Sequence, residues 1–470
     1  MHDFHYKNGK LFCENVAVED LVKQAGSPLY VYSQKTIVEN VNRLEIALAP
    51  LDVTICYAMK ANASLGILGL MACMELGFDV VSIGELRKVH FAGGDTKRCV
   101  FAGVGKTEAE ITDALKLGIY SFNVESVPEL ERINRIAGKL HKKAPVSIRV
   151  NPNVDAETHA KITTGTYANK FGIAFEEVEA IYRKAKRSYK NLHLKGVQMH
   201  IGSQLTDTAP FVKAVKKMIP LVKTLRDKYD IEFFSLGGGI GIAYQDALES
   251  GSADWWQTKG KNFISPEKFA DALIPLLQPL GVKILIEPGR FIVGNAGILV
   301  TRVEYVKQTP KKNFVVVDAA MNDLIRPALY DSYHQIVPLK QPRSGKTITA
   351  DIVGPICESG DCFRHDCQIT SVKEGDYLAL MSAGAYGMTM ASNYNGRPLP
   401  AEILVSGDQA DYLRLRENIH TTWKYEGIPQ WLLFEEEEQP EEKKEKKTPK
   451  KSSKKSSKKT AKKQTKSRKK

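Results

Sequence analysis

Between about Val53 and Arg290 the sequence alternates short apolar runs with longer amphipathic segments. This alternation is typical of a parallel sheet whose strands are joined by crossover helices. Helical patterns lie at 65–76, 107–117 and 209–229, and strand-like runs lie at 53–59, 78–82, 99–103, 119–124, 146–151, 195–202, 233–238 and 282–288. Eight strand-helix units in about 250 residues predict a (β/α)8 barrel, in which the chemistry sits at the carboxyl ends of the strands.

A second domain is expected after the barrel. Beyond about residue 300 the long helical patterns stop, and strand-like runs follow at 313–320, 348–355, 375–384 and 401–407. These runs predict a mostly antiparallel β domain. The stretches 11–21 and 27–33 also have strand character, so the amino-terminal residues are expected to join it. The predicted division is 1–35 with the β domain, 36–300 as the barrel, 301–430 as the β domain, and 435–470 as a tail.

The tail carries most of the chain's positive charge. The whole chain has a net charge of +13, but residues 443–470 hold 16 Lys or Arg and one acidic residue, so the remainder is slightly negative. The tail has no aromatic or large aliphatic residue, which predicts disorder. A segment of this charge can bind polyanions such as nucleic acid through 443–470. The alternative is a solvated extension with no specific partner.

The cysteines and the apolar runs bear on location. Seven cysteines, odd in number and scattered, argue against a disulfide framework. The sequence begins without the apolar run of a signal peptide, and it has no stretch near the roughly 18 apolar residues of a membrane span. We therefore expect a cytoplasmic protein without membrane contact.

A metal cluster is not expected from the sequence. The candidate ligands are Cys357, Cys362, His365 and Cys367, and their spacing is not that of paired CxxC motifs.

Two strand ends suggest a cofactor with an aldehyde and a phosphate. Lys60 directly follows the apolar run 53–59, so it is expected at the open end of the barrel. A partly desolvated amine there can have a depressed pKa and form a Schiff base with an aldehyde. The glycine run 237–241 follows the seventh strand, and its backbone N–H groups can approach a phosphate closely. Taken alone, Lys60 could simply extend to solvent and the glycine run could simply form a tight turn. Together they match the two attachment points of pyridoxal phosphate, its aldehyde and its phosphate.

Two further strand ends carry polar groups that suit the same cofactor. Glu287 and Arg290 follow the eighth strand, where a carboxylate could keep a pyridine nitrogen protonated and a guanidinium could clamp a carboxylate. His200 and Ser203 follow the sixth strand and offer a flat ring and a hydroxyl. A surface ion pair and a structural histidine are the alternatives.

These strand ends carry a family resemblance. YAMKAN (57–62), HIGSQ (200–204), GGGIG (237–241) and EPGR (287–290), in this order, resemble the alanine racemase-like barrel of the fold-type III pyridoxal-phosphate-dependent decarboxylases, over roughly residues 5–425. The resemblance implies that Lys60 is the Schiff-base lysine, that His200 stacks on the ring and that Glu287 faces the pyridine nitrogen. The full set of cofactor-binding residues it implies is Lys60, Asp79, Arg149, His200, Ser203, Gly238, Gly239, Glu287, Gly289, Arg290 and Tyr386.

Within that family, segments 321–334, 357–361 and 384–402 resemble the diaminopimelate decarboxylases. This implies decarboxylation of meso-2,6-diaminopimelate to L-lysine and CO2 by a homodimer with shared active sites. Cys357 would be the proton donor, delivered from the partner subunit. The implied substrate contacts are the distal carboxylate with Arg290, Arg326 and Tyr330, the distal amine with Glu358, and both phosphate and substrate with Tyr386.

Three alternatives remain open from the sequence. The nearest is a decarboxylase of another basic amino acid or of carboxynorspermidine, which would differ in its contacts to the far end of the substrate. A racemase would need an opposing catalytic base. A non-catalytic regulatory homologue would be expected to lack a working lysine or cysteine, whereas both Lys60 and Cys357 are present.

Overall fold

A closed barrel of parallel strands forms the first part of the fold in a computed structural model, which describes residues 1–154, 169–341 and 345–433. Strand β13 pairs with β5, and β8 pairs with β9, so the ring closes. The predicted (β/α)8 barrel is therefore confirmed. Its strands are β5 (Val53–Ala58), β6 (Gly77–Val80), β7 (Cys99–Phe101), β8 (Ser121–Val124), β9 (Ala144–Asn151), β11 (Leu192–Met199), β12 (Phe233–Ser235) and β13 (Lys283–Ile286), with β10 (Ile173–Ala174) added beside β9.

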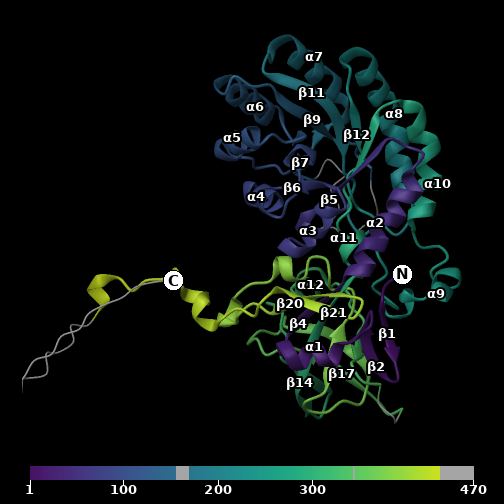
Figure 1. Cartoon of the computed structure of the whole chain (residues 1–470), viewed down its shortest axis with the longest axis vertical. Coiled ribbons are helices and arrows are strands. Elements are labelled where there is room, and N and C mark those ends of the chain that lie inside the picture. The colour runs from purple at the N-terminus through teal and green to yellow at the C-terminus, as the bar shows by residue number, and fades with distance from the viewer. Residues whose placement is uncertain (155–168, 342–344, 434–470) are drawn as a thin grey trace, which may run out of the picture. The chain divides into compact units, whose positions relative to one another are not determined.

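Helices surround the barrel strands (Figure 1). Several begin at a serine or threonine whose side chain accepts a hydrogen bond from a first-turn N–H, as Thr107 does in a capping box with Glu110. Their apolar faces pack on the strands, whose side chains are almost all buried. The helices are α2 (Gln34–Leu48), α3 (Leu65–Cys73), α4 (Ile83–Phe91), α5 (Glu108–Leu117), α6 (Val127–Lys139), α7 (Val178–Ser188), α8 (Ala209–Tyr229), α9 (Ala253–Gln257), α10 (Pro266–Leu277) and α11 (Arg290–Val293).

A second, mostly antiparallel sheet follows, in the order β18-β17-β15-β14-β4-β20-β21, with β19 paired to β14 and β16 paired to β19. Its internal strand β4 comes from the start of the chain and pairs with β14 and β20. The strands are β4 (Leu29–Ser33), β14 (Gly297–Gln308), β15 (Asn313–Val317), β16 (Ile336–Pro338), β17 (Thr347–Val353), β18 (Cys362–Thr370), β19 (Tyr377–Leu380), β20 (Ala401–Ser406) and β21 (Gln409–Arg414), and the short helix α12 (Arg326–Tyr330) follows β15.

One expected strand is partly wrong. The stretch 11–21 contributes to β2 (Lys10–Cys13) and β3 (Val16–Ala17), which form a small sheet with β1 (Phe4–Lys7), but then enters helix α1 (Val18–Ala25). Val18, Leu21 and Val22 are buried at helical spacing, so one face of a helix, not alternate strand positions, meets the core.

Residues Met1–Thr422 form one compact unit, and the chain from Trp423 forms a second, of which 423–433 are described and contain one short 3-10 turn (Gln430–Leu432). The predictions for the tail, 435–470 and its basic part 443–470, lie outside the described residues.

All seven cysteines lie within the described residues, and none of them is joined in a disulfide. In the described ranges, no helix is both long and apolar enough to cross a membrane.

Candidate active site

A cavity of about 370 Å³ opens at the carboxyl ends of the barrel strands. Its lining draws on seven strand ends and on the loop after β19. The structure brings together around it all eleven residues predicted to contact the cofactor: Lys60, Asp79, Arg149, His200, Ser203, Gly238, Gly239, Glu287, Gly289, Arg290 and Tyr386. This convergence of residues far apart in sequence makes the cavity the candidate cofactor site.

Lys60 lies just after β5, and its amine forms an ion pair with Asp79, which lies on the adjacent strand β6. The Lys60 side chain is 39% exposed, into the cavity that it lines, whereas the Asp79 side chain is 1% exposed. Burial alone would lower the pKa of Lys60, but the Asp79 carboxylate outweighs it, and the pKa is raised. The expectation of a depressed pKa is therefore wrong, because the sequence did not show that a carboxylate lies beside the amine.

Glu287 is held inside the barrel by three polar side chains. Its carboxylate accepts hydrogen bonds from Ser235 Oγ (2.7 Å), Gln198 Nε2 (3.1 Å) and Asn123 Nδ2 (3.4 Å). Burial, and next the nearby negative charge of Asp79, raise the pKa of Glu287 to about 7. A fixed carboxyl group of this pKa can share a proton with a basic ring nitrogen. The alternative of a surface ion pair does not apply, since Glu287 is buried.

The ring of His200 is oriented by the glycine run. The backbone N–H of Gly238 donates to His200 Nδ1 (3.2 Å), which leaves the ring proton on Nε2 if the imidazole is neutral. Burial, with the positive charge of Arg149 and Lys60, lowers the pKa of His200 well below its usual value, so the neutral form is favoured. Because Gly238 N–H is used in this bond, it contributes to placing the ring.

The glycine run also permits close packing of three loops. A Cβ on Gly238 would lie 2.3 Å from the carbonyl oxygen of Glu287, and one on Gly239 would lie 2.5 Å from that of Gly202. Gly239 moreover has φ +116°, which side chains rarely adopt. Any larger residue at either position would separate the strand ends that line the cavity.

The cavity has the properties that pyridoxal phosphate requires. An amine reaches into it, a carboxyl group of raised pKa lies at its buried end, and glycine backbone, Ser203 and Arg290 lie along its wall. Among the described residues, three buried polar atoms of lining side chains have no hydrogen-bond partner: Asp79 Oδ1, Gln198 Oε1 and Arg290 Nε. Buried polar groups are normally satisfied, so these atoms suit a polar molecule.

A second cavity of about 350 Å³ shares four lining residues with the first: His200, Ser203, Arg290 and Tyr386. It is also lined by Arg326 and Tyr330 of α12, two of the predicted substrate contacts. Arg290 connects the cavities, because its Nη2 donates to Ser203 Oγ (3.0 Å) and its Nη1 to the hydroxyl of Tyr244 (2.5 Å). Two buried guanidinium groups beside the candidate cofactor site can bind an anionic group of a substrate.

Tyr244 is a residue of this cavity that the sequence reading missed. It lies between the two arginines, with Arg290 bonded to its hydroxyl and the guanidinium of Arg326 4.6 Å from its ring centre. Burial would raise the pKa of Tyr244, but the charges of Arg290 and Arg326 outweigh this and lower it. His334 was missed too; its Nε2 lies 2.8 Å from Arg326 Nη1. For Tyr244, the only feature of the sequence that could have indicated its role is its position three residues after the glycine run 237–241.

Cys357 and Glu358 are not brought to either cavity by the described residues of a single chain. Both are exposed, in the segment between β17 and β18. Glu358 Oε2 accepts a hydrogen bond from the hydroxyl of Tyr394 (3.0 Å). Within one chain, therefore, neither residue lies where its predicted role, proton donation for Cys357 and amine binding for Glu358, would be carried out.

The fold and the cavity define a class of protein. The family described as "Pyridoxal-dependent decarboxylase, pyridoxal binding domain" matches residues 34–294, more than half of the chain, and the chain belongs to this family. Its cofactor is pyridoxal phosphate, as the sequence predicted. The fold-type III resemblance is confirmed as well.

Several similar relatives within that family are diaminopimelate decarboxylases. A diaminopimelate decarboxylase of Vibrio cholerae is 46% identical over 431 residues, which cover 91% of this chain and 99% of that protein. One of Neisseria meningitidis is 48% identical, covering 87% of this chain and 95% of that one. A crystal structure of diaminopimelate decarboxylase from Helicobacter pylori complexed with L-lysine superposes with a TM-score of 0.80 at 39% identity, covering 87% of this chain and 98% of that chain.

Proposed function

We propose that this chain decarboxylates meso-2,6-diaminopimelate to L-lysine and CO2 with pyridoxal phosphate. The observation that carries the proposal is the pair of buried arginines, Arg290 and Arg326, in a cavity that shares residues with the cofactor site. The names of the relatives, and the L-lysine bound in one of them, support the same reaction.

The chemistry of the second cavity favours this substrate over other basic amino acids. Meso-diaminopimelate carries a carboxylate and an amine at the end remote from the bond that breaks. Arg290, Arg326 and the hydroxyl of Tyr330 are donors suited to that carboxylate. Ornithine, arginine and carboxynorspermidine lack an equivalent group at that end, so buried arginines would remain unpaired against them, at a cost in binding.

The residues of the barrel would position the cofactor and control its protons. Bound pyridoxal phosphate supplies an electron sink for the negative charge left on the substrate carbon as CO2 departs. Lys60 would hold the cofactor through its aldehyde, Glu287 would keep a proton at the ring nitrogen, and His200 would cover one face of the ring. The glycines 238, 239 and 289, with Ser203, Arg290 and Tyr386, would contact the phosphate, while Asp79 and Arg149 would support the site.

Proton return to the product carbon is assigned to Cys357. We propose a homodimer in which Cys357 and Glu358 of one subunit complete the cavities of the other. The exposure of both residues and their absence from the lining of either cavity in one chain support this arrangement. Cys357 would donate its thiol proton, and Glu358 would bind the distal amine.

The test is a substrate panel. The purified protein with pyridoxal phosphate is incubated separately with meso-diaminopimelate, ornithine, arginine and carboxynorspermidine, and CO2 and the amine product are measured. CO2 and L-lysine from meso-diaminopimelate alone are expected. Release from only another amino acid would preserve the class of reaction and overturn the substrate assignment of Arg290, Arg326, Tyr330 and Glu358.

Location and the tail are further proposals. Unpaired cysteines support a reducing compartment, in keeping with a cytoplasmic enzyme.

The composition of 443–470 supports contact with a polyanion; the alternative is a solvated extension with no partner. Deleting 435–470 should leave turnover unchanged and remove salt-sensitive retention on immobilised DNA; equal retention without the tail would refute the polyanion contact.

A further inference from the structure

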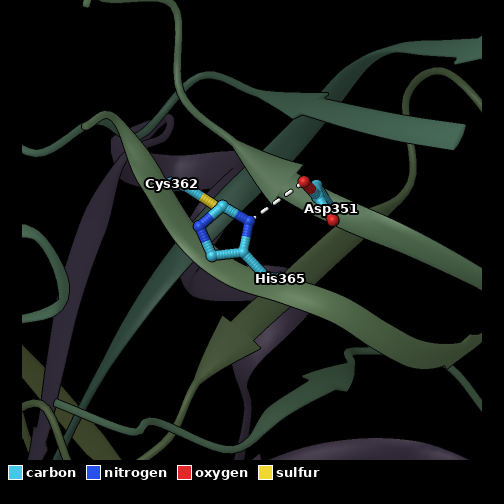
Figure 2. A group of neighbouring side chains, drawn as sticks. All are labelled: Asp351, Cys362 and His365. Atoms are coloured by element: carbon cyan, nitrogen blue, oxygen red, sulfur yellow. Dashed lines mark hydrogen bonds and ion pairs between the residues drawn. The ribbon is translucent and has the colours of Figure 1, made fainter. Parts of the chain in front are cut away.

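Three potential metal ligands converge on strands β17 and β18 of the second sheet, and none of them lines either of the two cavities described above. They are Asp351 of β17 and Cys362 and His365 of β18, whose ligand atoms all lie within 4.8 Å of one another. Figure 2 shows the three side chains together, with the imidazole of His365 facing the carboxylate. This differs from the cluster considered from sequence: Cys357 and Cys367 take no part, and an aspartate 11 residues before Cys362 does.

An irregularity in the sheet creates the cluster. Residues i and i+3 of a regular strand point to opposite faces, so Cys362 and His365 would be separated. The pairing of β17 with β18 shifts register between Ala350 and Ile352 and again between Ile352 and Val353, so β18 contains extra residues there. Such bulges re-aim side chains. They bring both β18 residues to the side where Asp351 lies.

The geometry fits a single small ion. His365 Nδ1 lies 3.0 Å from Asp351 Oδ2 and 3.5 Å from Cys362 Sγ, so one ring nitrogen faces both other ligands. Zinc bonds of about 2.0–2.3 Å in tetrahedral geometry place neighbouring ligand atoms about 3.3–3.6 Å apart. The Asp351 side chain is 5% exposed and its Oδ1 accepts from the backbone N–H of Asp366 (2.9 Å), so the carboxylate is already oriented.

We propose that Asp351, Cys362 and His365 bind a divalent zinc ion, with water in the fourth position. On binding, the Cys362 thiol releases its proton to solvent and becomes the thiolate ligand. The proton shared near His365 Nδ1 moves to Nε2, so that a neutral imidazole coordinates through Nδ1. The ion joins β17 to β18 where the ladder of backbone hydrogen bonds is interrupted, and therefore stabilises the folded chain.

One cation already contacts the cluster. Lys312 Nζ donates to Asp351 Oδ2 at 2.8 Å, the same oxygen that faces His365. A carboxylate oxygen has two lone pairs, so lysine and zinc can share it, but their charges repel. Removing the lysine charge should therefore tighten zinc binding, a gain that damage to the fold could not produce.

The experiment uses the full chain loaded with pyridoxal phosphate and titrated with Co²⁺ as a spectroscopic probe, then with Zn²⁺. We expect one Co²⁺ per chain to give the intense bands of tetrahedral cobalt, at longer wavelength than the cofactor absorbs, and Zn²⁺ to abolish them. Cys362→Ser and His365→Ala should weaken binding about 100-fold or more. Cys73→Ser, an exposed cysteine elsewhere, and Cys357→Ser should leave it unchanged.

Lys312→Met should tighten Zn²⁺ binding by about tenfold. Zn²⁺ should also raise the melting temperature of the wild-type chain and of Lys312→Met, but not of Cys362→Ser. Weak octahedral-type cobalt bands in the wild type, bands that persist in Cys362→Ser, bands lost in Cys357→Ser, or unchanged affinity in Lys312→Met would each overturn the site.

Discussion

The amine of Lys60 is paired with the carboxylate of Asp79, and this pair keeps the lysine charged before the cofactor arrives. A protonated amine is not a nucleophile, so the pair sets the pH at which the cofactor can attach. It also holds the amine in place inside the cavity. The ion pair thus holds the Lys60 amine in position and, by keeping it protonated, slows its reaction with the aldehyde of the cofactor.

Replacing Asp79 with Asn should move cofactor attachment to lower pH. The pKa of Lys60 is raised chiefly by this carboxylate against the effect of burial, so its removal lowers that pKa and enlarges the neutral fraction at any pH below it. The measurement is the rate at which visible absorbance of the lysine-bound cofactor appears in the cofactor-free protein, as a function of pH. An Asp79→Asn profile that coincides with the wild-type profile would contradict the role of the pair.

Replacing Lys60 with Asn should prevent that absorbance from forming and abolish turnover. An amide cannot bond to the aldehyde in place of an amine. Absorbance spectra after incubation with pyridoxal phosphate and removal of the excess decide the matter. Lys223→Asn, on an exposed position of α8, is the matched control and should behave as the wild type. If the Lys60 variant still gave the wild-type spectrum, another amine would be the attachment point.

Replacing Arg326 with Met should reduce kcat/KM for meso-diaminopimelate about 10- to 100-fold, because a charged hydrogen bond contributes about 1.5–3 kcal/mol. The loss should appear mainly in KM. The spectrum of the bound cofactor should not change, since Arg326 lines only the second cavity. Arg302→Met, which removes a surface arginine, is the control. A fall in kcat alone would show that Arg326 does not bind the distal carboxylate.

Mixing two inactive variants should restore activity if the active sites are shared. A dimer of one Lys60→Asn chain and one Cys357→Ala chain contains one intact site and one doubly altered site. Random exchange of subunits should therefore give about a quarter of wild-type activity. Activity is measured after unfolding and refolding the mixture, with each variant refolded alone as control. No recovery, in mixtures whose dimers are shown to have exchanged, would place both residues in the same subunit's site.

Acid should destabilise the protein partly through His334. Its Nδ1 donates to the Met381 carbonyl and its Nε2 faces Arg326, so burial and then that arginine lower its pKa from 6.5 to about 3. Between these values the unfolded chain binds a proton that the folded chain excludes. The free energy of unfolding therefore falls as pH decreases from about 6.5 toward 3, and is unaffected above 6.5.

The His334→Gln variant, which cannot take up that proton, isolates this effect. Between pH 7.5 and 5.5 the wild-type protein should lose about 1 kcal/mol more stability than the variant. Urea unfolding at the two pH values provides the measurement. Equal losses of stability in the wild type and the variant would mean that His334 has the same pKa in the folded and the unfolded chain.

The barrel and the cofactor cavity were predictable because they depend on local pattern. Buried parallel strands have continuous apolar runs, and a polar residue after such a run, as with Lys60, is placed at the barrel mouth by the fold itself. The pKa of Lys60 was not predictable, because it depends on the pairing of β5 with β6. Tyr244 and His334 were missed because their significance comes from Arg290 and Arg326, which are distant in sequence. Helix α1 was misread because a short apolar run fits either period.

Strand β4 has a consequence for the order of events during synthesis. It is made among the first residues of the chain, yet it lies between β14 and β20, and β20 begins only at Ala401. A ribosome releases the barrel segments well before this last partner exists. The second sheet therefore cannot be completed until translation has passed β20, and until then the edge of β4 that faces β20 remains unpaired and open to incorrect association with other nascent chains.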